Sequence, residues 1–134
     1  MKREIAYLSI MTTGCRYCEA HAIRAAKRNV SSQERLENIC EYKSHEAFSE
    51  SDRAMFDLAI AASQVPNSVS EEIKTRAKKF FNEGEIVEIL GVVALFGYLN
   101  RWNDSMGTEL ENPAVKSAEK ILGAKGWEVG KHFY

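Results

Sequence analysis

The segment at residues 15–21 reads CRYCEAH and carries two cysteines three residues apart. It follows a Thr-Thr-Gly break and opens a run of helix-forming residues. Unpaired N–H groups and the helix dipole at a helix start stabilise a thiolate relative to a thiol. Cys15 and Cys18 are therefore predicted to form a redox or nucleophilic pair. His21, one helical step after Cys18, is close enough to exchange a proton or a hydrogen bond with it.

Two less specific interpretations of the pair remain open, namely buried structural cysteines and a zinc site. Zinc usually takes four ligands, and Cys40, His45 and His132 are not spaced as a second ligand pair. Redox chemistry is therefore favoured, and neither a metal nor a cofactor is expected. Cys40 is interpreted as a small buried hydrophobic residue.

Composition restricts the class of protein. With 134 residues, 45% hydrophobic content and a net charge of −1, residues 1–134 are expected to form one ordinary globular domain. The absence of a basic excess argues against nucleic acid as a partner. Three cysteines do not suit a disulfide-stapled secreted scaffold, and the first apolar run is too short for a signal peptide. The longest apolar run, residues 86–99, is too short for a membrane span. We expect a cytoplasmic protein without membrane contact.

Helix signals dominate the chain, which predicts an all-α fold of about six to seven helices. Helices are expected over residues 3–13, ending at Gly14; 16–28; about 32–40, capped by Ser31; 50–62, capped by Ser49 and ended by Pro66; 71–81, after a capping box at 68–71; 83–107, capped by Asn82; and 113–123. Glycines at 123, 126 and 130 are expected to loosen the tail around Trp127, Phe133 and Tyr134.

The predicted long helix is apolar on nearly all faces between Ile86 and Leu99, which indicates burial on most sides. A chain of this length has few other helices to surround it, so a homo-oligomer is predicted, with Phe96, Leu99 and Trp102 near the contact. The polar run at residues 100–104 continues the same helix. Such groups either meet partners at a subunit contact or line a pocket, and the contact is favoured.

Three features together resemble the AhpD-like members of the carboxymuconolactone decarboxylase family: Glu4 eleven residues before Cys15, the CRYCEAH segment, and the NRWNDSMG run at residues 100–107. The resemblance covers roughly residues 4–109. It implies an all-α homo-oligomer with peroxidase or disulfide-reductase activity in alkyl-hydroperoxide defence. In AhpD the second cysteine is oxidised to a sulfenic acid and the first is the proton donor and resolving thiol, roles that fall on Cys18 and Cys15. Glu4 and His21 would form the proton relay.

The chain departs from that pattern at two positions. AhpD has its histidine four residues after the second cysteine, where this chain has Ala22, and a further histidine between the cysteines, where it has Tyr17. The three-residue spacing leaves His21 beside Cys18 but turned from Cys15. With a chain reversal at Gly14, we expect Glu4 to orient His21 and His21 to activate Cys18. The alternatives are an ordinary acidic residue at a helix start and an ordinary hydrogen-bonded helix histidine.

The expected reaction starts with attack of the Cys18 thiolate on a hydroperoxide. Cys15 then condenses with the sulfenic acid to form a disulfide, which an unknown thiol or disulfide partner must reduce. Two rivals remain open. One is a non-catalytic oligomeric helical protein whose cysteine pair only senses redox state or clamps the fold, and the other is a reductase of a partner protein's disulfide.

Overall fold

The computed structural model describes residues 1–28 and 32–132, and within these ranges the chain is all-helical, as predicted. These two ranges contain seven α-helices and three short 3-10 helices. In chain order these are α1 Lys2–Thr13, α2 Arg16–Arg28, α3 Gln33–Asn38, η1 Ile39–Glu41, α4 Glu50–Ser63, α5 Glu71–Lys78, α6 Glu83–Met106, α7 Asn112–Leu122, η2 Gly123–Lys125 and η3 Gly130–His132.

Local capping explains where most of the helices begin. Ser49 and Asn82 each form a full capping box. The cap side chain accepts the backbone N–H of the third helical residue, and the acidic side chain of that residue accepts the backbone N–H of the cap residue. The predicted capping box at residues 68–71 is wrong, because Ser70 rather than Ser68 caps α5, which begins at Glu71. The predicted cap Ser31 lies outside the described residues, and Ser32 caps α3.

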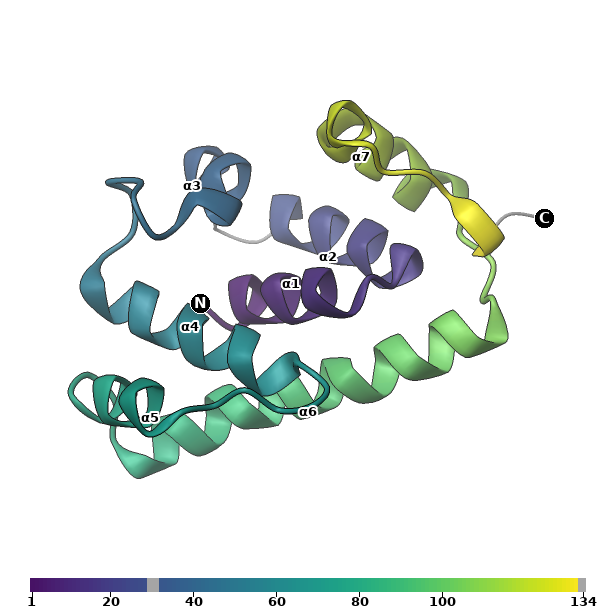
Figure 1. Cartoon of the computed structure of the whole chain (residues 1–134). Helices are drawn as coiled ribbons and strands as arrows, with labels where there is room; N and C mark the ends of the chain where they lie inside the picture. Colours follow the sequence, from purple (N-terminus) through teal and green to yellow (C-terminus); the bar gives the residue numbers. More distant parts are fainter. Residues whose placement is uncertain (29–31, 133–134) are drawn as a thin grey trace.

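The central helix of the fold is α1, which lies between α2, α4 and α6 (Figure 1). Seven consecutive side chains of α1, residues 4–10, are buried. The sequence indicated α6 as a helix buried on most sides with part of its covering from another copy, and within the single chain only Ile89, Val93 and Asn100 of α6 are buried. Sequence hydrophobicity marks a helix that must be covered, but it does not say whether the same chain covers it.

One face of α6 remains open to solvent. Its exposed large apolar side chains recur at helical spacing and are Val87, Leu90, Leu95, Tyr98, Trp102 and Met106. Two of the residues expected at a subunit contact, Phe96 and Leu99, are half-buried, whereas Trp102 is 56% exposed. We call this row of side chains the α6 stripe.

The C-terminal tail is packed, in contrast to the loose tail predicted from its glycines. Helix α7 lies against α2, and the segment after it returns toward the end of α6 (Figure 1). The backbone N–H of Leu110 donates to the carbonyl of His132 at 2.9 Å, and the side chains of Trp127 and His132 are buried. Phe133 and Tyr134 lie outside the described residues. Among the helices that the structure describes, none is both long and apolar enough to cross a bilayer.

Candidate functional site

The turn at Gly14 places Cys15 at the start of α2. Gly14 ends α1 in the left-handed conformation, with φ 75°, and donates its N–H to the Ile10 carbonyl at 3.0 Å. Glycine adopts this conformation without steric cost. The chain reverses within one residue, and the carbonyl of Cys15 accepts the N–H of Glu19 at 3.0 Å. Cys15 therefore occupies the N-cap position of α2, where free backbone N–H groups point toward its side chain.

The two thiols lie in contact in an apolar environment. The Sγ atoms of Cys15 and Cys18 are 3.0 Å apart, and both residues are buried and free of disulfide bonds. This separation is a hydrogen-bond contact, about 1 Å longer than a disulfide. Ile10 is buried with them, and Phe96 packs against the same cluster. The pair is therefore a dithiol that a small movement would close to a disulfide.

The hydrogen bonds distinguish the two sulfurs. The backbone N–H of Cys18 donates to Sγ of Cys15 at 3.4 Å. The pKa of the Cys15 thiol is lowered by the hydrogen bond with the Cys18 side chain, although burial opposes the shift. The pKa of the Cys18 thiol is raised by the same hydrogen bond and by burial. Both shifts favour Cys15 over Cys18 as the first thiol to ionise, whereas the AhpD resemblance implies Cys18 as the nucleophile.

The end of α6 supplies two polar residues to this site. The Nδ2 atom of Asn103 lies 3.9 Å from Sγ of Cys18 and donates to the carbonyl of Leu99 at 2.9 Å. Asp104, one residue on, lies near enough to Cys15 to oppose its ionisation. The sequence analysis assigned the polar run at residues 100–104 mainly to a subunit contact. In the structure this run is divided, because Trp102 is exposed whereas Asn103 and Asp104 lie at the thiols.

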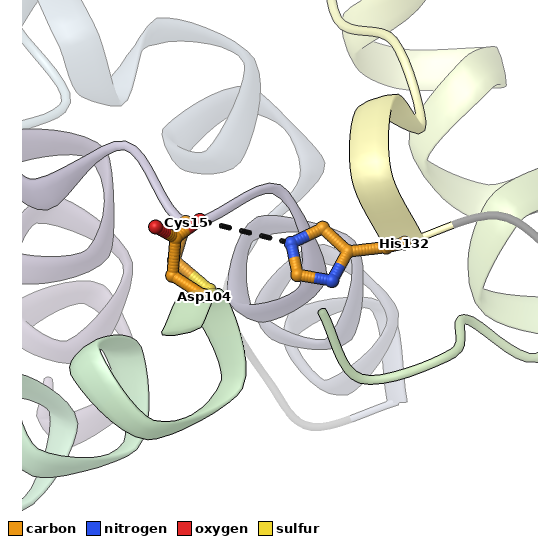
Figure 2. A group of neighbouring side chains, drawn as sticks. All are labelled: Cys15, Asp104 and His132. Atoms are coloured by element: carbon orange, nitrogen blue, oxygen red, sulfur yellow. Dashed lines mark ion pairs between the residues drawn. The ribbon is translucent and has the colours of Figure 1, made fainter. Parts of the chain in front are cut away.

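His132 is the site residue that sequence reasoning missed. It comes from η3 in the tail, and its side chain is only 1% exposed. Its Nδ1 atom is 2.9 Å from the carbonyl of Thr108, so Nδ1 carries the hydrogen of this bond. Its Nε2 atom faces Asp104 and Cys15 (Figure 2). The ring of Tyr17 lies 5.9 Å from that of His132, so the tail covers the start of α2.

Glu4 does not contact His21 as the sequence analysis predicted. Its buried carboxylate is held by the guanidinium of Arg35, with Oε1 2.8 Å from Nε and Oε2 3.3 Å from Nη2. The amino group of Met1 lies 3.0 Å from the same Oε2. Arg35 also donates to Asp52, at 3.1 and 3.2 Å. Glu4 thus joins α1 to α3 and α4, in a structural role.

His21 also has a different partner from the one expected. Its Nε2 atom lies 2.9 Å from Oε2 of Glu111, as an ion-pair contact rather than an aligned hydrogen bond. Its ring packs on that of Tyr17, with centroids 4.5 Å apart. The structure therefore brings Cys15 and Cys18 together and places Glu4 and His21 in separate contacts, so the predicted relay is not formed.

We expect His21→Ala to leave the reactivity of the dithiol nearly unchanged. Because His21 joins α2 to Glu111 at the partly exposed surface, its removal should cost about 1 kcal/mol or less of folding free energy. The alkylation rate of the pair by iodoacetamide, measured at neutral pH in a Cys40→Ser background, should change by less than about 3-fold. A fall of tenfold or more in the alkylation rate would contradict this expectation and support the direct activation of Cys18 by His21.

Cys40, which the sequence suggested was buried, is exposed, with Sγ 3.7 Å from Sδ of Met11. It lies at the end of the chain's third helical segment, where the short 3-10 helix η1 presents it to solvent. Cys40 is therefore a surface thiol, and measurements on the buried pair require a variant that lacks it.

A polar groove lies beside the thiol site. It has a volume of about 710 Å³ and runs between the end of α1, the α4–α5 connection and the second half of α6. Its lining includes Thr13, Gln64 and Asp104, together with Asn100, whose buried amide has no hydrogen-bond partner. Asp104 is thus shared between the groove and the surroundings of Cys15. A groove of this size can hold a small organic molecule.

Comparison with known proteins identifies the fold. No protein-family model matches the chain, and no curated protein matches it in sequence. A protein of unknown function from Agrobacterium tumefaciens, regarded as a candidate antioxidant defence protein AhpD, superposes with a TM-score of 0.76 at 14% identity, over 82% of this chain and 76% of that one. The chain therefore has the AhpD-like fold, which confirms the fold that the resemblance implied.

A second protein of similar structure has a higher sequence identity to this chain. The debrominase Bmp8 superposes with a TM-score of 0.84 at 28% identity, over 90% of this chain. A cysteine-to-alanine variant of Bmp8 in complex with 2,3,4-tribromopyrrole gives the same TM-score at 27% identity. The chain spans 64% of the length of Bmp8. The fold of this chain is thus found in an enzyme, the debrominase Bmp8, as well as in a candidate antioxidant defence protein.

Proposed function

We propose that this protein is a thiol oxidoreductase whose Cys15–Cys18 dithiol gives two electrons to a small molecule and closes to a disulfide. The observation that carries the proposal is the contact of two free, buried thiols at 3.0 Å, one of which accepts a backbone N–H at the start of α2. A buried thiol pair in this geometry combines a nucleophile with its resolving thiol.

A hydroperoxide is the preferred substrate, because the fold is that of AhpD-like proteins. The Cys15 thiolate attacks one peroxide oxygen, the O–O bond breaks, and the departing alkoxide takes a proton from water. This gives an alcohol and a sulfenic acid on Cys15. The Cys18 sulfur then forms the disulfide while the hydroxyl of the sulfenic acid leaves with a proton as water. An external thiol must reduce the disulfide, and we expect this in a reducing compartment such as the cytoplasm.

Reductive dehalogenation of an aromatic ring is the second candidate, and the similarity to Bmp8 favours it. In that reaction a carbon–bromine bond is replaced by a carbon–hydrogen bond. The dithiol supplies two electrons, becomes a disulfide, and releases bromide and a proton. The groove beside Asp104 is large enough for a small brominated heterocycle. Both candidates use the same pair of thiols and differ in the bond that is reduced.

The two candidates can be separated with a single preparation. Reduced protein carrying Cys40→Ser is mixed with one equivalent of cumene hydroperoxide or of 2,3,4-tribromopyrrole, and remaining thiols, alcohol and bromide are measured. We expect the hydroperoxide to consume two thiols and yield one alcohol. Bromide release with disulfide formation, without reaction of the hydroperoxide, would assign the second function. Failure of both compounds to consume thiols would overturn the proposal.

We further propose that a second copy of the chain covers the α6 stripe. Six large apolar side chains exposed along one helix exceed what a single chain usually leaves open to water. Sedimentation at micromolar concentration should therefore give a mass of two chains or more. Trp102→Glu should shift the protein toward the monomer, whereas Phe80→Gln, an exposed aromatic outside α6, should not. A wild-type monomer of about 15 kDa would contradict this assembly.

A further inference from the structure

Three metal-ligating side chains converge at the reactive end of α2. They are Cys15 at the helix start, Asp104 near the end of α6, and His132 in η3 (Figure 2). One ligand atom from each, Sγ, a carboxylate oxygen and a ring nitrogen, lies within 4.8 Å of the other two. The three residues are far apart in sequence, so the packing of the tail on α2 and α6 creates the group.

His132 presents to this group a nitrogen atom that has no hydrogen-bond partner. Its Nε2 atom is buried and has no hydrogen bond, although the side chain is almost fully enclosed. A buried polar atom without a partner costs free energy, so its presence calls for an explanation. The other ring nitrogen, Nδ1, is bound to the Thr108 carbonyl at 2.9 Å. Metal-binding histidines commonly make this bond, because it fixes the ring and leaves Nε2 free to coordinate.

Asp104 is oriented toward the same point. Its Oδ2 atom is bound by the ammonium of Lys131 at 2.9 Å, whereas Oδ1 lies 3.8 Å from Nε2 of His132. Neighbouring ligand atoms around a tetrahedral zinc ion are roughly 3.3–3.6 Å apart, as zinc–ligand bond lengths of about 2.0–2.3 Å require. A small inward movement of the carboxylate would therefore bring Oδ1 to coordinating distance. Lys131 is exposed and can keep its contact with Oδ2.

We propose that Cys15, Asp104 and His132 bind one Zn²⁺ ion in the reduced protein. A thiolate, an imidazole and a carboxylate are all established zinc ligands, and the mixed set favours zinc over calcium or magnesium. Three protein ligands leave the fourth position open to water. The sequence argued against a zinc site because it contains no second pair of ligands at a suitable spacing. The ligands that join Cys15 are Asp104 and His132, which are brought to it only by the fold.

The site would exclude the redox reaction while it is occupied. Zinc binds the Cys15 sulfur as a thiolate, and the same sulfur forms the disulfide with Cys18, so one sulfur cannot do both. Oxidation to the disulfide should therefore abolish binding, and zinc should protect the pair from oxidation. This mutual exclusion rests on the proposed function, whereas zinc binding itself does not.

The test is a titration of reduced, metal-free protein with Zn²⁺ alone by calorimetry, and with Co²⁺ alone by absorption spectroscopy. We expect one ion per chain and, for cobalt, a thiolate charge-transfer band in the near ultraviolet. Asp104→Asn and His132→Gln should each weaken binding at least about 10-fold. Cys40→Ser and His45→Gln, which alter residues outside the group, should bind as the wild type does. Asp104 is half-exposed, so its variant should fold even if the His132 variant does not.

Several results would overturn the zinc site. They are the absence of one-to-one binding, unchanged affinity in Asp104→Asn, or equal binding by protein oxidised to the Cys15–Cys18 disulfide. The proposed function has a separate readout, which is thiol loss on addition of hydroperoxide to metal-free protein. If zinc does not bind and the thiols are still consumed, the metal site falls and the oxidoreductase stands.

Discussion

In Cys15→Ser the rate of the first oxidation by hydroperoxide should fall by a factor of about 10³ or more, which is the scale expected when the attacking nucleophile is removed. Cys18→Ser should keep that step and stop at a sulfenic acid on Cys15. The reason is that Cys15 lies at the helix start and accepts the Cys18 N–H, and both contacts favour its thiolate. Serine at position 18 can still donate a hydrogen bond to the Cys15 sulfur. Stopped-flow kinetics with dimedone trapping and mass spectrometry measures both outcomes.

Both variants are made in a Cys40→Ser background, because Cys40 is an exposed thiol that would trap reagent. The background protein itself should react as the wild type does. The opposite result, with the first step lost in Cys18→Ser and a sulfenic acid on Cys18 in Cys15→Ser, would give Cys18 the role that the AhpD resemblance implies. It would also show that access to the sulfur outweighs thiolate stabilisation at this site.

Arg35→Met should lower the free energy of unfolding by about 3 kcal/mol, because it leaves the carboxylate of Glu4 buried without its guanidinium partner. Arg35 also bonds to Asp52 and to the carbonyl of Ala47, at 2.7 Å, and lies 4.6 Å above the ring of Phe48. One side chain thus joins α1, α3 and the start of α4. Urea unfolding followed by circular dichroism measures the loss.

Two controls make this result specific. Lys74→Met removes an exposed ion pair with Glu71 and should change stability by about 0.5 kcal/mol or less. Adding Glu4→Gln to Arg35→Met should recover part of the loss, since the uncompensated charge is gone. A loss in Arg35→Met no larger than that in Lys74→Met would contradict the structural role of Glu4.

The same network should respond to acid. Burial raises the pKa of Asp52, but hydrogen bonds from Arg35 and Ser49 outweigh it and hold that pKa below its ordinary value. A carboxylate with a lowered pKa in the folded state stabilises the fold at neutral pH, and this contribution is lost as the pH falls through its folded pKa. The acid-induced loss of stability should therefore be smaller in Arg35→Met than in the wild type.

The helices could be predicted because their signals are local. Gly14 ends α1, and Ser49 and Asn82 cap their helices through bonds to residues within the next turn. The arrangement of the helices was harder to predict. The polar residues Glu4 and Ser9 do not mark α1 as the central helix, yet both are buried there, and Arg35, 31 residues later, bonds to the Glu4 carboxylate. In α6 the apolar pattern indicated burial, and the covering is missing from the single chain.

The site was predictable only where it is contiguous in sequence. Cys15 and Cys18 are adjacent on one helical turn, so their spacing alone predicts the pair. Asp104 and His132 reach Cys15 through the packing of α6 and the tail. The polar run at residues 100–104 marked Asp104 only as a contact or pocket residue, and no local pattern marks His132. The relay from Glu4 through His21 followed from the family resemblance, and in this chain both residues have other ion-pair partners.

The central claim is that Cys15 and Cys18 interconvert between a dithiol and a disulfide. The most direct measurement equilibrates the Cys40→Ser protein in glutathione redox buffers, alkylates the free thiols and maps the products by mass spectrometry. The account predicts a single reversible two-electron transition, with a tenfold change in the ratio of disulfide to dithiol for about 30 mV, and an intramolecular Cys15–Cys18 disulfide as the oxidised form. Stable glutathione adducts on separate cysteines, or thiols that stay reduced across the series, would contradict it.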